Sequence, residues 1–157
     1  MNNKKNIILL GSTGSIGQSS LRLLRKNKDK FNLIGVSAHN NVMLLSEIVN
    51  EFNVPHVVLS NPQNARNYYG KNKLNVGESS LTELAKISCD IVISGITGMT
   101  GLHPAFAAIS VGNNLAIANK ETLVSAGKIF LEKSFKNKAK ILPVDSEIGR
   151  ASCRERV

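Results

Sequence analysis

Short aliphatic runs alternate with longer amphipathic stretches along the chain, and this alternation limits the possible folds more than any other feature. The aliphatic runs cover residues 6–11, 31–38, 56–60, 90–95, 114–119 and 139–144. The helix candidates between them cover residues 16–26, 42–52, 81–87, 104–111 and 121–135. Runs that are almost continuously apolar are typical of strands covered on both faces. The pattern predicts an α/β fold with a doubly wound, mainly parallel sheet, in which residues 61–75 form a polar surface segment with a short helix at most.

The composition fits a single domain of this kind. The chain has 157 residues, of which 42% are hydrophobic and only 4% aromatic, so we expect a mainly aliphatic core. Its apolar runs are much shorter than a membrane-spanning helix requires, and its basic start leads into glycine and serine rather than a signal-peptide core. Its two cysteines, Cys89 and Cys153, form neither a disulfide framework nor a metal-binding spacing, which favours the cytoplasm.

The formal net charge of +9 raises the question of a nucleic-acid partner. The lysines are scattered, with small clusters at 26–30 and 133–140, and no basic stripe is interleaved with aromatic residues. Long charged side chains are mostly exposed to solvent in folded proteins. We therefore interpret the charge as solvated helix ends and loops, and we expect neither a nucleic-acid nor a membrane partner.

A glycine-rich segment, GSTGSIG, lies directly between the first predicted strand and the first predicted helix. Its glycines are Gly11, Gly14 and Gly17, and its hydroxyl donors are Ser12, Thr13 and Ser15. In a Rossmann-like fold this turn presents helix N–H groups to a pyrophosphate, and a side chain there would block close approach of the ligand. A glycine triplet in this context predicts a dinucleotide-binding site.

The end of the second predicted strand bears on which dinucleotide binds. The strand continues into His39, Asn40 and Asn41 and carries no acid. NAD sites usually have Asp or Glu here on the ribose diol, and a carboxylate would repel a 2′-phosphate. The sequence therefore favours NADPH, while an ordinary surface loop is the alternative interpretation of His39.

Two further motifs follow the last two aliphatic runs. In the first, Asn119 can cap a helix and Glu121 favours its dipole, but Lys120 places a cation at the positive end of that helix. An anionic ligand would compensate this charge. In the second, PVDSE, Asp145 and Glu147 lie two residues apart and point the same way in an extended segment, where they could bind one divalent cation.

Taken together and in this order, GSTGSIG, ANKE and LPVDSE resemble the N-terminal part of the 1-deoxy-D-xylulose 5-phosphate reductoisomerase family. The stretch GITGMTGLHPAFAAISVGNNLAIANKE is also similar to the segment of that family that leads into its NKE motif. The resemblance covers residues 5–147. It implies an enzyme that uses NADPH and Mg²⁺ or Mn²⁺ to isomerise and reduce 1-deoxy-D-xylulose 5-phosphate to 2-C-methyl-D-erythritol 4-phosphate for isoprenoid synthesis.

The resemblance also implies roles for individual residues. The residues that would bind the cofactor are Thr13, Gly14, Ser15, Ile16, His39, Asn40, Asn41, Asn119 and Glu121. Lys120 and Ser146 would contact the phosphorylated sugar, and Lys120 would also be catalytic together with Asp145 and Glu147. The same two carboxylates would ligate the metal, which would stabilise charge that develops on the substrate oxygens.

The similarity to the family stops at Glu147, where the composition also changes. Of the six arginines, three lie in the last eight residues, within IGRASCRERV. We therefore expect an NADPH-binding domain over residues 1–144, the start of a catalytic domain over 145–147, and a foreign or artefactual tail over 148–157. The fragment would be a monomer that binds cofactor without turnover, whereas the full-length protein would be a homodimer.

Two other classes of protein stay open from the sequence. Another NAD(P)-dependent Rossmann oxidoreductase would share the glycine loop but would need catalytic residues of its own. A non-catalytic NADPH-binding module would keep the loop and lose the catalytic motifs, whereas Lys120, Asp145 and Glu147 are all present.

Overall fold

The computed structural model describes residues 3–118 and 120–144, without the side chains of residues 120–123 and 125. Its strands form one seven-stranded sheet in the order β4-β3-β2-β1-β5-β6-β7. The strands are β1 (Lys5–Leu10), β2 (Phe31–Ala38), β3 (His56–Leu59), β4 (Leu74–Val76), β5 (Ile91–Ser94), β6 (Asn114–Ile117) and β7 (Ile141–Pro143). Every strand pair is parallel, which confirms the predicted Rossmann-like, doubly wound α/β fold.

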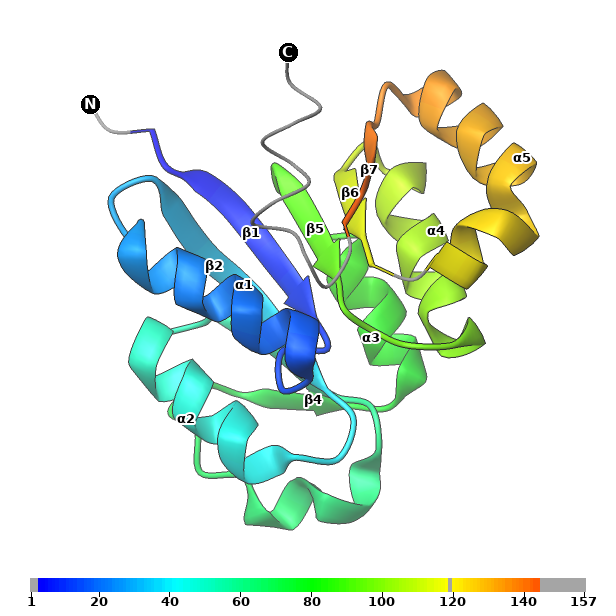
Figure 1. The fold of residues 1–157 in the computed structure, drawn as a ribbon. Coiled ribbons are helices and arrows are strands. Elements are labelled where there is room, and N and C mark those ends of the chain that lie inside the picture. Colours follow the sequence, from blue (N-terminus) through cyan, green and yellow to red (C-terminus); the bar gives the residue numbers. More distant parts are fainter. Residues whose placement is uncertain (1–2, 119, 145–157) are drawn as a thin grey trace.

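Helices cover both faces of the sheet (Figure 1). They are α1 (Ser15–Lys26), α2 (Val42–Phe52), α3 (Glu78–Ala85), α4 (Leu102–Ser110) and α5 (Lys120–Asn137), with short 3₁₀ helices η1 (Pro62–Asn67) and η2 (Met99–Gly101). Side chains of α1 and α2 pack on one face, and side chains of α3, α4 and α5 pack on the other. None of the helices in the described ranges is long and apolar enough to cross a membrane.

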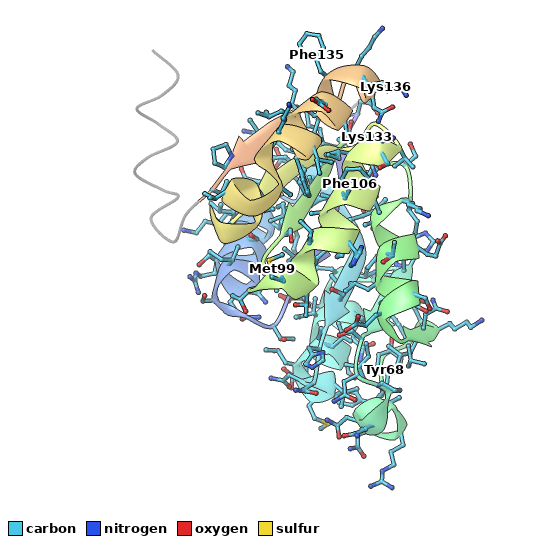
Figure 2. All side chains as sticks on the ribbon, turned by 90° about the vertical axis from the view of Figure 1, so that its right-hand side faces the viewer. Tyr68, Met99, Phe106, Lys133, Phe135 and Lys136 are labelled. Carbon is cyan, nitrogen blue, oxygen red and sulfur yellow. The ribbon has the colours of Figure 1, made fainter. Side chains whose placement is uncertain are left out.

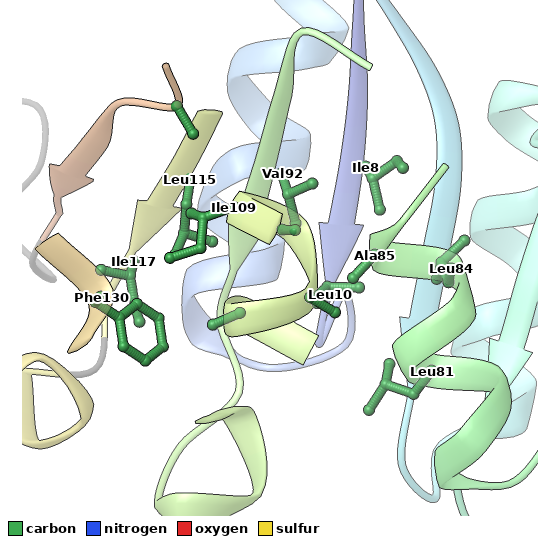
Figure 3. Close-up of a cluster of buried hydrophobic side chains, with 14 of the residues drawn as sticks. Ile8, Leu10, Leu81, Leu84, Ala85, Val92, Ile109, Leu115, Ile117 and Phe130 are labelled. Atoms are coloured by element: carbon green, nitrogen blue, oxygen red, sulfur yellow. The ribbon is translucent and has the colours of Figure 1, made fainter. Parts of the chain in front are cut away.

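The core is aliphatic because successive strand residues point to opposite faces of the sheet. In β1, Ile7 and Leu9 join the cluster beneath α1 and α2, whereas Ile8 and Leu10 join the cluster beneath α3 and α4. Figure 3 shows the second cluster, which extends from Leu84 of α3 across the sheet to α5. Both faces of this central strand are thus buried, as the continuous apolar run predicted.

Helix α5 packs against α4, and Figure 2 labels Phe106 of α4 and Lys133 of α5 in this region. The ring of Phe130, 1% exposed, meets the ring of Phe106 edge-on at a centroid distance of 5.6 Å. Lys133 lies over the other ring, with its Nζ 5.9 Å from the centroid of Phe106. Phe135 follows Phe130 on the same helix but is 91% exposed.

Most element boundaries differ from the sequence prediction by one or two residues, and two differences are larger. Residues 74–76 form the edge strand β4, whereas the prediction left 61–75 without a strand. Only Leu74 of the three is even partly buried, so no apolar run marks this strand. Helix α3 begins three residues before the predicted start, because Gly77, with φ of 94°, ends the preceding segment and Glu78 opens the helix.

Candidate functional site

A cavity of about 290 Å³ opens where the turns after β1, β2, β3 and β5 meet α3. It lies at the point where the chain leaves β1 toward one edge of the sheet and β5 toward the other. The lining residues are Gly11, Thr13, Gly14, Ser37, Ala38, His39, Ser60, Glu78, Leu81, Gly95, Ile96, Thr97 and Thr100. Open α/β sheets bind ligands at this switch point, so the cavity is the candidate site.

Two glycines of the loop are required by the fold itself. Gly11 has φ of 75°, and a Cβ there would lie 3.1 Å from the carbonyl carbon of Gly95 at the end of the neighbouring strand. At Gly17 a Cβ would lie 2.4 Å from the Gly11 carbonyl oxygen. Both positions therefore need glycine so that β1 can turn into α1 beside β5.

Gly14 is different, because none of the described residues requires glycine there. Its φ of −82° suits any L-residue, and a Cβ would meet only the Gly11 carbonyl oxygen, at an ordinary 3.7 Å. Gly14 lines the cavity and is the N-cap of α1, where no side chain caps the helix and the first turn holds no acidic residue. The N–H groups at this helix start, together with the helix dipole, suit an anionic ligand.

Of the hydroxyl groups in the loop, one makes a structural hydrogen bond and another lines the cavity. Ser12 is fully buried, and its Oγ donates to the Ser37 carbonyl at 2.8 Å, so this hydroxyl holds β1 to β2 rather than a ligand. Ser37 Oγ in turn accepts from the Gly11 N–H at 3.0 Å. Thr13 lines the cavity, whereas Ser15 and Ile16 are the first two residues of α1 and are not among the lining residues.

The loop after β2 offers one of its three predicted residues to the cavity. His39 lines it, and its Nδ1 lies 2.8 Å from Ser60 Oγ. Asn40 Oδ1 accepts from Asn61 Nδ2 at 2.6 Å, and Asn41 Oδ1 accepts from the Leu44 N–H at 3.1 Å as the N-cap of α2. No acid stands at the end of β2, as predicted, and the carboxylate among the described lining residues is Glu78 of α3.

The predicted substrate and metal residues lie at the margin of the described chain. Lys120 is the first residue of α5, three positions after β6, as predicted for the NKE motif. The side chains of Lys120 and Glu121, and all of residues 119 and 145–147, lie outside the described residues. The last described residue, Val144, donates its N–H to the Ile117 carbonyl at 2.9 Å. In the described part of the chain, no three His, Cys, Asp or Glu residues are grouped as a metal site would need.

Several cavity residues escaped the sequence prediction. Ser60 follows β3, Thr97 and Thr100 follow β5, and Glu78 with Leu81 comes from α3. The segment SGITG after the fourth aliphatic run was the available signal, because the strand that pairs with β1 across the switch point contributes the opposite wall. No sequence signal pointed to Glu78, because α3 follows β4, a strand that the sequence did not predict.

The parallel sheet, the glycine turn and the uncapped start of α1 at the switch point define a Rossmann-like domain of the kind that binds dinucleotides. The 1-deoxy-D-xylulose 5-phosphate reductoisomerase family matches residues 7–127. The chain belongs to this family.

Relatives and solved structures agree with this assignment. The chain is 41% identical over 148 residues to 1-deoxy-D-xylulose 5-phosphate reductoisomerase from Thermoanaerobacter sp. (strain X514), covering 91% of this chain and 38% of the relative. The reductoisomerase from Zymomonas mobilis in complex with NADPH superposes with a TM-score of 0.87 at 33% identity, over 92% of this chain and 40% of that one. A reductoisomerase in complex with NADPH, fosmidomycin and magnesium gives 0.83 at 30% identity, over 92% and 37% of the two chains. This chain thus spans about 38% of the length of the relative.

Proposed function

We propose that the chain is the cofactor-binding part of an NADPH-dependent reductoisomerase that converts 1-deoxy-D-xylulose 5-phosphate to 2-C-methyl-D-erythritol 4-phosphate. The observation that carries the proposal is the cavity in which Gly14 and the uncapped start of α1 face the same space. Membership of the family and the NADPH complex of the Zymomonas mobilis protein support the choice of cofactor.

A dinucleotide fits the residues that are present. The open N-terminus of α1 suits the pyrophosphate, and the missing side chain at Gly14 leaves room for its close approach. The adenosine ribose would then lie toward the end of β2, where His39 and Ser60 line the cavity and the strand itself ends without an acid. The nicotinamide half would extend toward the turn after β5, along Thr97.

We place the chemistry next to this cofactor because β6 and β7 are adjacent and parallel. The chain segments that follow both strands leave the sheet at the edge where the cavity lies. Lys120 opens α5 after β6 and would bind the anionic substrate together with Ser146. Asp145 and Glu147 offer the hard oxygen ligands that Mg²⁺ or Mn²⁺ prefers, and the cation would stabilise negative charge on the substrate oxygens.

The chain by itself would bind cofactor and not turn over, because two carboxylates do not complete the shell of a six-coordinate cation. Turnover would require the additional residues that the longer relatives have. We expect the full-length protein to be a homodimer. The substrate and metal motifs are all present in the sequence. Their presence argues against the alternative of a non-catalytic NADPH-binding module.

The first test is NADPH binding by the purified chain, followed by cofactor fluorescence. We expect saturable binding, and we expect Gly14→Ala to weaken it at least about tenfold, since a new methyl group would occupy the pyrophosphate's place. The unfolding midpoint of that variant should match the parent because the Cβ meets no close atom. Equal affinity in both proteins, or no binding in either, would contradict the proposal.

A second test concerns turnover. NADPH, the phosphorylated sugar and Mg²⁺ are mixed with the chain and with a full-length relative as the positive control. We expect oxidation of NADPH only with the relative. Oxidation of NADPH by the chain alone would show that the additional residues of the relatives are dispensable for turnover, and would contradict the proposal.

A further inference from the structure

Helix α5 presents much of its apolar surface to solvent. Of the eleven large apolar side chains that are exposed among the described residues, four belong to this one helix: Val124, Ile129, Leu131 and Phe135. Phe135 lies at the outer end of the helix, away from Phe106 (Figure 2). Single exposed apolar side chains are common, but several gathered on one surface mark an interaction site.

One face of α5 carries a continuous stripe of these residues. The outer stripe consists of residues spaced by four, three and four positions, which fall along one side of a helix: Val124, Lys128, Leu131 and Phe135. This is the spacing of the two inward-facing positions of a coiled-coil heptad. A different face of α5 anchors the helix, because Phe130 packs into the core and is 1% exposed. The outer stripe is therefore turned away from the domain and can meet another helix.

The outer stripe is complementary to itself when two copies of the helix run antiparallel. With the direction of one helix reversed, Val124 comes opposite the partner's Phe135, and Leu131 comes opposite the partner's Lys128. The aliphatic stem of a lysine can cover a leucine while its ammonium group stays in water. That ammonium group then lies beside Glu132, the residue after Leu131. A parallel pairing would instead set the two Lys128 side chains against each other.

We propose that the outer stripe of α5 is the contact surface for a second copy of this chain, paired antiparallel about a twofold axis. A twofold contact uses the same surface on both copies, and this stripe gives each apolar residue an apolar partner and each charge an opposite one. Lys128 and Glu132 are both exposed, and neither belongs to an ion pair with another described residue, so both are available. The proposal is independent of the cofactor, because no described residue of α5 lines the cavity.

The contact is small, so the pairing should be weak. The outer stripe extends along about 17 Å of helix, whereas a standard stable interface buries about 1,600 Å² in total. The net charge of +9 on each copy adds repulsion. We therefore expect a dissociation constant on the order of 100 µM, so that the chain is a monomer in dilute solution and pairs as its concentration rises.

The test is sedimentation velocity on this chain between about 10 µM and about 500 µM, in about 0.3 M salt to screen the repulsion. The sedimentation coefficient of the parent should rise with concentration toward that of a dimer. Leu131→Lys should raise the dissociation constant at least about tenfold, because each dimer loses two apolar contacts. Leu23→Lys is the matched control and should keep the parent value, since Leu23 is a 55% exposed leucine on α1. A coefficient that does not change with concentration, or an equal effect of both variants, would overturn the proposal.

Exchange of the two charges tests the antiparallel pairing. Lys128→Glu alone and Glu132→Lys alone each place like charges side by side, and each change acts twice in a dimer, so each should weaken pairing about tenfold. The double variant restores opposite charges and should return to within about threefold of the parent. Both residues are exposed, so circular dichroism of all three variants should match the parent. A double variant weaker than either single variant would refute the pairing.

Two other occupants of the outer stripe would give different results. Vesicles of phosphatidylcholine with about 30% phosphatidylserine probe an anionic lipid surface, which a helix with lysines and exposed apolar side chains can also bind. We expect the parent chain not to co-sediment with these vesicles. Co-sedimentation that Leu131→Lys abolishes, by a chain that does not dimerise, would assign the stripe to lipid and overturn the proposal. A chain that binds neither itself nor vesicles would leave the stripe to the additional residues of the longer relatives, which also overturns it.

Discussion

Gly17→Ala is the substitution whose outcome most directly tests the geometry of the glycine loop. Gly17 is the third residue of α1, where alanine would ordinarily be the better residue because it loses less backbone entropy. Here the new Cβ would lie 2.4 Å from the Gly11 carbonyl oxygen and 2.5 Å from the Ser12 carbonyl carbon. All of the nearest atoms are backbone, so no side chain can turn away.

The magnitude follows from how far the backbone must move. Ordinary contact begins at 3.4 Å, so the loop or the helix must shift by about 1 Å. The loop resists, because the N–H and Oγ of Ser12 both donate to the Ser37 carbonyl, at 2.7 and 2.8 Å. Overpacking of this kind costs about 1–3 kcal/mol, and the gain from alanine in a helix is at most about 1 kcal/mol. We expect the free energy of unfolding to fall by about 2 kcal/mol.

Gly127→Ala is the matched control. Gly127 lies inside α5, and a Cβ there would meet no atom within 4 Å, so the same substitution should raise the stability by about 0.5–1 kcal/mol. Urea unfolding is followed by far-UV circular dichroism, since the chain has no tryptophan. The reasoning fails if Gly17→Ala is as stable as the parent, or if the two alanines change stability in the same direction.

Three further predictions concern the core and the surface. Phe130→Ala should destabilise by about 3–5 kcal/mol in urea unfolding, whereas Phe135→Ala on the same helix should change stability by less than about 0.5 kcal/mol, because their exposures are 1% and 91%. Asn113→Ala should cost about 3 kcal/mol by the same assay, since the buried amide bonds the Cys89 N–H and the carbonyls of residues 85 and 87 at 2.9–3.1 Å. Glu51→Gln should cost less than about 1 kcal/mol at neutral pH, because its ion pair with Arg25 is more than one-third exposed. The hydrogen bond from Arg25 lowers the pKa of Glu51 below 4.5, so the difference between parent and variant should disappear in acid as the pH falls through that lowered value.

The strands and helices that bury apolar residues on a regular period were predictable. Residues 31–38 and 42–52 were predicted as a strand and a helix, and β2 and α2 have these same bounds. The edge strand β4 was not predictable, because it has three residues and two of them are exposed, so pairing with β3 rather than burial makes it a strand. A backbone pairing of this kind leaves no trace in the hydrophobic pattern.

The position of the site was predictable, but the contacts made by individual side chains were not. The glycine turn lies at the end of β1 and forms the cavity wall, as the spacing indicated. Asn41 illustrates the limit, because its Oδ1 caps α2. An asparagine just before a predicted helix is a strong N-cap signal, and that interpretation competed with cofactor binding. Its role toward NADPH therefore stays a prediction, whereas its role in α2 is observed.

The three glycines of the loop show why sequence and structure answer different questions. In the sequence they are equivalent members of one motif. In the structure, Gly11 and Gly17 are each explained by the protein's own backbone, through a positive φ in one case and a 2.4 Å approach in the other. Gly14 has neither explanation, although it lines the cavity together with Gly11. A substitution at Gly11 or Gly17 would lower binding by disturbing the fold, so only Gly14 can separate the requirements of the ligand from those of the chain.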